Sequence, residues 1–172
     1  IVSSAIDPIE KKPLNHFYPG SSTFSLGSIG CNLRCIHCQN WQISHLVGFD
    51  VESQLDDLSP EEAVSKAQES NCQSLVWTYN EPSIWIEYIL DSAKLARKAG
   101  LKTVLVTAGL INRLPLSSLL EWIDAYRLDI KGFSEGFYQR LTGSRILRQV
   151  LDSAKLAYTA GAHVEIVTNV IP

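Results

Sequence analysis

A segment that occurs twice in this chain constrains the fold more than any other feature. Residues 90–100 read LDSAKLARKAG and residues 151–161 read LDSAKLAYTAG. Each copy has the apolar spacing of an amphipathic helix, ends on a glycine that suits a helix C-terminus, and precedes a β-like segment containing Val-Thr. A repeated helix that leads into a strand predicts parallel β/α units with right-handed crossovers.

The rest of the chain divides into segments with the same two patterns. Ser59 and Pro60, followed by two glutamates, form a helix start, because serine caps, proline suits the first helical position and carboxylates favour the positive end of the helix dipole. We expect strands at residues 22–27, 74–79, 101–107, 125–131 and 162–171. We expect helices at residues 59–70, from after Pro82 to Gly100, and at 116–123, 134–141 and 146–160.

The strand expected at 125–131 carries charges on one face only. Arg127, Asp129 and Lys131 share this face, while the residues between them are apolar. Outer helices require an apolar face on the sheet, so the charged face should point inward, toward the lumen of a barrel. The polar residues of the last expected strand should face the same way: His163, Glu165 and Asn169.

These patterns predict an α/β fold, a partial (β/α)6 TIM-like barrel of parallel strands that is truncated here to about five strands. Residues 1–20 contain three prolines and neither hydrophobic period, so we expect an extended N-terminal lead-in. Residues 21–172 should form one incomplete barrel domain. The chain contains no methionine and stops within an apolar run, and we therefore expect it to be part of a longer protein.

Charge and hydropathy limit the classes of partner. The formal net charge is -3, and no tract of lysine and arginine supports binding to nucleic acid. No apolar run approaches the roughly 18 residues that a membrane span needs, and the N-terminal residues do not resemble a signal peptide. We expect no nucleic-acid partner, no membrane partner and a cytoplasmic location.

Three of the four cysteines lie within eight residues: Cys31, Cys35 and Cys38. In a cytoplasmic protein such a group indicates a metal site or a catalytic site rather than disulfides. Structural zinc usually has four protein ligands in two pairs, and zinc with His37 as a further ligand is an alternative here. A [4Fe–4S] cluster with three protein thiolates leaves one iron open to a cofactor or substrate, and we favour it. Cys72 is expected to be an ordinary half-buried thiol.

Polar residues gather at the ends of the expected strands. In a β/α barrel these ends meet at one mouth, where the chemistry takes place. Glu81 precedes a helix and has the alternative role of favouring the helix dipole, and Asp129 and Lys131 have the alternative role of a structural ion pair. Besides the cysteines, the expected strand ends carry Asn80, Glu81, Thr107, Asp129, Lys131, Thr168 and Asn169.

The cysteine spacing, Cys31-x3-Cys35-x2-Cys38, resembles the cluster motif of the radical S-adenosylmethionine (SAM) superfamily. Other stretches resemble the AmmeMemoRadiSam-system radical SAM proteins, which are relatives of pyruvate formate-lyase activating enzymes. These stretches are residues 9–14 (IEKKPL), 16–20 (HFYPG), 38–41 (CQNW), 78–82 (TYNEP) and 129–131 (DIK). The likeness covers nearly the whole chain, although His37 replaces the aromatic residue that commonly precedes the third cysteine.

The resemblance implies a reaction. The three cysteines would hold a [4Fe–4S] cluster, and SAM would chelate the open iron. One electron would cleave SAM to methionine and a 5′-deoxyadenosyl radical, which abstracts hydrogen from a substrate. Glycyl-radical activation of a partner enzyme is one version of this oxidoreductase activity, with a protein as the substrate and flavodoxin or ferredoxin as the electron donor.

The resemblance also implies the residues that bind SAM, and it assigns no catalytic residue. Asn80 or Glu81 would accept from the ammonium group, and Lys131 would pair with the carboxylate. The full set of expected SAM contacts is Asn80, Glu81, Thr107, Asp129, Lys131 and Thr168. Two other classes of function stay open: an iron–sulfur or zinc protein that does not cleave SAM, and a metal-independent barrel enzyme whose cysteines are incidental.

Overall fold

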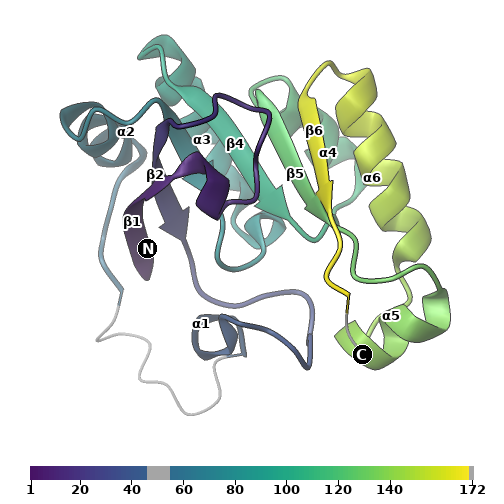
Figure 1. The fold of residues 1–172 in the computed structure, drawn as a ribbon. Coiled ribbons are helices and arrows are strands. Elements are labelled where there is room, and N and C mark those ends of the chain that lie inside the picture. The colour runs from purple at the N-terminus through teal and green to yellow at the C-terminus, as the bar shows by residue number, and fades with distance from the viewer. Residues whose placement is uncertain (46–54, 171–172) are drawn as a thin grey trace.

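The computed structural model describes residues 1–45 and 55–170. A six-stranded sheet forms its centre, with the strands in chain order (Figure 1). β1 runs antiparallel to β2, and all other neighbours are parallel. The strands are β1 (Ser3–Pro8), β2 (Ser22–Gly27), β3 (Ser74–Trp77), β4 (Lys102–Thr107), β5 (Ala125–Asp129) and β6 (His163–Val167). Within the described part of the chain β1 and β6 are the two edges, so the sheet is open and the predicted partial barrel is confirmed.

Helices cover one face of the sheet and extend past one end of it (Figure 1). The covering helices are α2 (Pro60–Glu69), α3 (Ile86–Lys98), α4 (Arg113–Leu120) and α6 (Leu147–Thr159). α1 (Trp41–His45) and α5 (Glu135–Thr142) lie beyond the end at which the parallel strands finish. Two short 3-10 helices are η1 (Ile9–Lys11) and η3 (Pro82–Ile84). The sequence did not predict α1.

Both copies of the repeated segment form the end of a helix that leads into a parallel strand. The first copy ends α3 before β4, and the second ends α6 before β6. Gly100 and Gly161 have φ angles of 79° and 88°, a left-handed conformation that glycine adopts without steric cost. The start of α2 follows the prediction too, because the Ser59 hydroxyl accepts from the Glu62 backbone N–H at 3.2 Å while the Glu62 carboxylate accepts from the Ser59 N–H at 2.8 Å.

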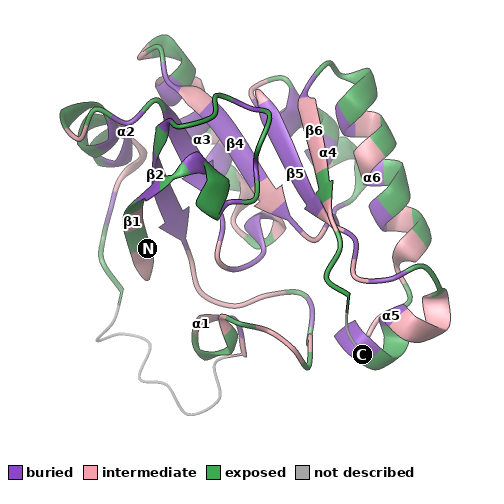
Figure 2. Cartoon of the chain, viewed as in Figure 1, coloured by how far each residue is buried: buried purple, intermediate pink, exposed green. Residues whose placement is uncertain are grey.

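The larger apolar cluster lies between the sheet and its covering helices. Trp77, Leu105 and Leu128 project from three neighbouring strands into this layer and are almost inaccessible to water. Figure 2 shows β2 to β5 largely buried, whereas β1, β6, the N-terminal lead-in and the outer sides of the helices are exposed or half-buried. Leu128 and Ile130 face the helices, as the alternation along residues 125–131 predicts.

A smaller apolar cluster covers the inner face of the sheet near the start of the parallel strands. Val76, Val104 and Ala125 are direct neighbours in the strand register and form one row across β3, β4 and β5. Three buried residues that follow β1 lie against this row: Ile9, Leu14 and Phe17. The lumen is therefore closed by apolar side chains at this level.

The N-terminal lead-in is more regular than its sequence indicates. Residues 3–8 form an edge strand that pairs with β2, and alternate residues of this strand are exposed to solvent. The sequence shows no hydrophobic period here because the one large apolar residue of the strand, Ile6, is exposed, while the charged Asp7 is buried. The described chain thus contains one antiparallel strand in addition to the five parallel strands that were predicted.

A carboxylate on β6 fastens the lead-in to the opposite edge of the sheet. Glu165 accepts from the backbone N–H groups of Asn15 at 2.9 Å and His16 at 3.0 Å. The rings of His16 and His163 are also within hydrogen-bond distance of its oxygens. Burial alone would raise the pKa of Glu165, but these hydrogen bonds outweigh it and lower the pKa from 4.5 to about 2.

This pKa shift predicts how the stability of the fold depends on pH. The depressed pKa means that the Glu165 carboxylate contributes stability above pH 4.5 and loses it as the pH falls through about 2. Glu165→Gln should lower the free energy of unfolding by about 1 kcal/mol at pH 7, and the difference from the wild type should shrink toward pH 3. Urea unfolding at several pH values measures both quantities.

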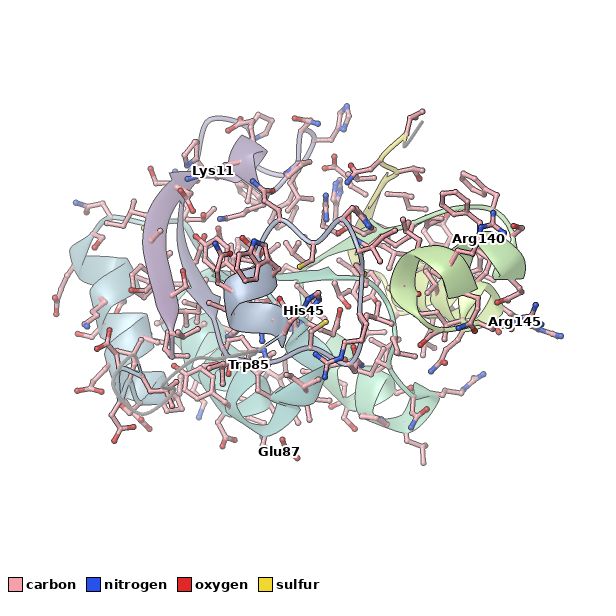
Figure 3. All side chains as sticks on the ribbon, turned by 90° about the horizontal axis from the view of Figure 1, so that it is seen from below. Lys11, His45, Trp85, Glu87, Arg140 and Arg145 are labelled. Atoms are coloured by element: carbon pink, nitrogen blue, oxygen red, sulfur yellow. The ribbon has the colours of Figure 1, made fainter. Side chains whose placement is uncertain are left out.

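The matched control is Glu87→Gln, because Glu87 is exposed on α3 (Figure 3). It should change the free energy of unfolding by less than about 0.5 kcal/mol at every pH. A Glu165→Gln difference that stays constant from pH 7 to pH 3 would contradict the role given to the ionised carboxylate.

Candidate functional site

A cavity of about 520 Å³ lies on the inner side of the sheet where the parallel strands end. Figure 3 views the molecule from this end, with Lys11 of the lead-in on one side and Arg140 of α5 on the other. Thr168 does not line the cavity, whereas its neighbours Val167 and Asn169 do. Eight residues predicted from the sequence lie together in its wall: Cys31, Cys35, Cys38, Asn80, Glu81, Thr107, Asp129 and Lys131.

Hydrogen bonds from its backbone to α1 and α5 hold the cysteine loop, residues 30–38, in place. The Gly30 N–H donates to the Ile43 carbonyl of α1 at 2.7 Å. The N–H groups of Arg34 and Ile36 donate to carbonyls at the end of α5 at 2.9 and 3.0 Å. Leu33 is buried, and its N–H lies 3.4 Å from the Cys31 sulfur. Two helices that project past the sheet therefore fix the loop from both sides.

Asn80 fastens the start of the cysteine loop to the end of β3. Its side-chain oxygen accepts from the Ser28 N–H at 3.0 Å, and its side-chain nitrogen donates to the Gly30 carbonyl at 3.0 Å. On the other side of the loop, the Asn40 amide donates to the Tyr79 carbonyl at 2.8 Å. Both asparagines thus position the loop, a role that the sequence did not indicate.

Glu81 joins the ends of β3 and β4. One carboxylate oxygen accepts from the Thr107 hydroxyl at 2.6 Å, and the other accepts from the Ala108 N–H at 2.8 Å. Glu81 also caps η3 by accepting from the Ser83 N–H at 3.2 Å. The side chain is 2% exposed, and this burial raises its pKa despite the hydrogen bonds. The helix-start role that was left open for Glu81 is therefore present.

The charged row on β5 faces the cavity as predicted. Asp129 lies between two cations, with the Arg127 Nη1 at 2.6 Å and the Lys131 Nζ at 3.1 Å. The alternative of a structural ion pair is thus realised, with Arg127 as an additional member. One carboxylate shared by two cations leaves this row with an excess of positive charge.

A second buried charge cluster in the cavity wall was missed by the sequence analysis. The Lys12 ammonium lies 2.6 Å from the Asp7 carboxylate and 4.4 Å from the centroid of the Tyr79 ring. Burial alone would raise the pKa of Asp7, but hydrogen bonds from Lys11, Lys12 and Tyr79 hold it well below its usual range. Burial lowers the pKa of Lys12 and raises that of Tyr79. Adjacent lysines in a proline-rich segment usually lie on the surface, so the sequence gave no sign that Lys12 is buried.

The comparison with protein families identifies the chain. The family model of the radical SAM superfamily matches residues 26–172. This chain belongs to the radical SAM superfamily. The cofactors of this family are a [4Fe–4S] cluster and SAM. The resemblance found in the sequence is confirmed at the level of the superfamily.

A sequence relative and several solved structures accompany this radical SAM match. An uncharacterised protein of Methanocaldococcus jannaschii is 41% identical over 172 residues, which are 100% of this chain and 50% of that protein. The chain therefore spans half the length of the curated relative it matches.

Two solved structures are similar in fold. Streptococcus suis SuiB bound to SAM has a TM-score of 0.59 and 18% identity, over 83% of this chain and 31% of SuiB. SuiB has also been solved with the precursor peptide SuiA. QueE of Escherichia coli has a TM-score of 0.52 and 13% identity, over 98% of this chain and 93% of QueE. At these identities the likeness shows the fold alone.

The donor groups of this radical SAM chain suit an iron–sulfur cluster. Cys31, Cys35 and Cys38 are half-buried free thiols that all face the cavity, and soft thiolates are the ligands that these clusters take. His37 lines the same cavity, whereas Cys72 is buried away from it. Burial raises the pKa of Cys31 to about 11, so the free thiol keeps its proton at neutral pH and would release it to solvent when a metal binds the sulfur. In the described part of the chain, no three His, Cys, Asp or Glu side chains are placed to hold a single metal ion.

In residues 1–45 and 55–170 no helix combines the length and the apolar character that crossing a membrane requires.

The bonds from Asn80 predict how strongly the loop holds iron. Asn80→Ala removes two hydrogen bonds to the loop backbone, and at about 0.5–1.5 kcal/mol for each bond the affinity for iron should fall about tenfold. The measurement is the iron retained per chain after anaerobic reconstitution and competition with a chelator.

Asn112→Ala is the matched control, because Asn112 is exposed before α4 and its side chain makes no capping hydrogen bond. It should retain iron as the wild type does. Equal retention by Asn80→Ala and the wild type would show that Asn80 does not position the loop.

Proposed function

We propose that this chain is the cofactor-binding part of a radical SAM enzyme. In this proposal Cys31, Cys35 and Cys38 each bind one iron of a [4Fe–4S] cluster and leave the fourth iron to SAM. The observation that carries the proposal is the convergence of the three thiols with predicted polar residues from β3, β4 and β5 on one cavity of about 520 Å³. Membership of the radical SAM superfamily supports the same assignment.

The polar wall suits a ligand that carries both an ammonium and a carboxylate. Lys131 is proposed to pair with the carboxylate of SAM, because it is a cation at the rim that shares its one carboxylate partner with Arg127. Asn80 and Glu81 already accept hydrogen bonds from the protein, so they would meet the ammonium through their remaining lone pairs. Thr107 and Asp129 are proposed to contact the ribose or the methionine part. The end of the last strand is proposed to meet the adenine, through the cavity-lining Val167 and Asn169 rather than through Thr168 as expected.

The chemistry itself belongs to the cofactors. When bound and reduced, the cluster supplies one electron that cleaves SAM to methionine and a 5′-deoxyadenosyl radical, which abstracts hydrogen from the substrate. The chain's own residues bind and orient these groups and exclude water, with the apolar row under the lead-in closing the lumen. We propose on this basis that the enzyme is a radical SAM oxidoreductase.

The proposal extends to the substrate and the partner proteins. We propose an enzyme like the pyruvate formate-lyase activating enzymes, located in the cytoplasm and reduced by flavodoxin or ferredoxin. Activation of a glycyl-radical enzyme is one version, in which the substrate is a protein. The peptide bound by SuiB supports peptides as a substrate class for a radical SAM protein of this fold.

Anaerobic reconstitution tests this function. The wild type should take up iron and sulfide and, when reduced with dithionite, convert SAM to 5′-deoxyadenosine and methionine. Uptake without SAM cleavage would assign the chain to iron–sulfur proteins of another function, and uptake of zinc alone would assign it to zinc proteins. A chain that takes up neither metal would leave the cysteines incidental.

Cys35→Ala should reduce iron uptake at least about tenfold and abolish 5′-deoxyadenosine, because two thiolates do not hold the cluster. Cys72→Ala is the matched control, since Cys72 is the one remaining cysteine and lies outside the cavity. It should take up iron as the wild type does. Normal iron content and turnover in Cys35→Ala would overturn the ligand assignment.

A further inference from the structure

Arg127 lies on the floor of the cavity, deeper than the predicted SAM contacts. It is in register with Val106 on β4 and Glu165 on β6, one inward-facing row below Asp129. The next row toward the start of the strands is the apolar row covered by the lead-in. Arg127 is therefore the first cation above the closed end of the lumen, and Lys131 lies nearer the rim, two residues past the end of β5.

The positive charge of Arg127 is not balanced by a carboxylate of its own. The side chain is 8% exposed, and its Nη1 shares Asp129 with Lys131. The carboxylate beside it in register, Glu165, is turned to the lead-in and accepts from Asn15 and His16 instead. Lys12 across the cavity likewise shares one carboxylate, Asp7, with Lys11.

One edge of the Arg127 guanidinium is left without a partner. A carboxylate binds arginine best through two parallel N–H bonds, and the Nε and Nη2 groups form one such edge. In the described part of the chain Nε is buried and has no hydrogen-bond partner, and the ion pair with Asp129 uses Nη1. A buried donor without an acceptor is costly, so a ligand carboxylate at this edge would satisfy a group that the protein leaves unpaired.

We propose that Arg127 binds a carboxylate of the enzyme's substrate at the floor of the cavity. The inference rests on the proposed function, because it places the substrate beneath SAM in the same cavity. A rotation of the side chain that turns the Nε–Nη2 edge to the lumen, with Asp129 still accepting from Nη1, completes the contact. The substrate class is then a carboxylic acid, such as an amino acid, a small organic acid or an acidic peptide side chain that reaches into the lumen.

The test uses NMR to monitor the Arg127 guanidinium while acetate is added as a probe for a substrate carboxylate. The protein is labelled with ¹⁵N-arginine, reconstituted with its cluster and kept oxidised, and the ¹H–¹⁵N signals of the arginine Nε groups are recorded with and without SAM. The Arg127 signal is the one that Arg127→Gln lacks, or that Arg127→Lys lacks if the glutamine variant does not fold. Acetate should shift this signal saturably in the presence of SAM, whereas sodium chloride at equal ionic strength should not.

Arg145→Gln is the matched control, because Arg145 is exposed just after α5 and does not line the cavity (Figure 3). Its Arg127 signal should respond to acetate as in the wild type. A signal that does not move with acetate would overturn the proposal. A signal that SAM alone shifts, and that acetate then leaves unchanged, would assign Arg127 to the carboxylate of SAM and overturn the substrate role. Because the readout is the guanidinium itself, it is independent of whether 5′-deoxyadenosine forms.

Discussion

The hydrogen bonds made by Asn80 and Glu81 are the constraint on which the site depends. These adjacent side chains leave the end of β3 in two directions, one to the cysteine loop after β2 and the other to the end of β4. Three consecutive strand ends are thereby held at fixed separations. A cluster loop without regular secondary structure needs such a tie, since its own backbone has no ladder of hydrogen bonds to keep the thiols facing one cavity.

Charge is distributed over the cavity wall in two clusters with the same balance of charges. Asp7 forms ion pairs with Lys11 and Lys12 on the lead-in side. Asp129 forms ion pairs with Arg127 of β5 and with Lys131, which follows β5. Each cluster has one more cation than anion. A wall with this excess suits the negative charge that three thiolates bring to a cluster loop, and it suits ligands that carry carboxylates.

The sequence predicted the parts of the fold that have a repeated pattern. The helix–glycine–strand repeat predicted the parallel units, and Ser59 and Pro60 predicted the start of α2, because helix periodicity and caps are local signals. The alternation of Arg127, Asp129 and Lys131 correctly identified the inner face. The cysteine spacing correctly identified the superfamily because each thiol has a defined place in the cluster motif.

What the sequence did not predict depends on contacts between distant segments. Lys12 is buried only because Asp7 and Tyr79 meet it across the cavity wall, and a single pair of lysines gives no local sign of this. The strand β1 was missed because an edge strand needs no hydrophobic period. Asn80 was expected to bind a ligand, and the structure adds a second role, because its amide also bonds the backbone of Ser28 and Gly30. Only the positions of these two residues reveal that role.

Ile9, Leu14 and Phe17 close the cavity at the end where the parallel strands begin. Glu165 of β6 holds this closure in place by accepting hydrogen bonds from Asn15 and His16. Because β1 pairs with β2, the lead-in is attached at both edges of the sheet. Within residues 1–45 and 55–170, apolar side chains thus fill the lumen at the side where the strands begin. In the described part of the chain, Arg127 is reached from the side of the cysteine loop, so a ligand bound at that loop would cover Arg127 and any group bound to it.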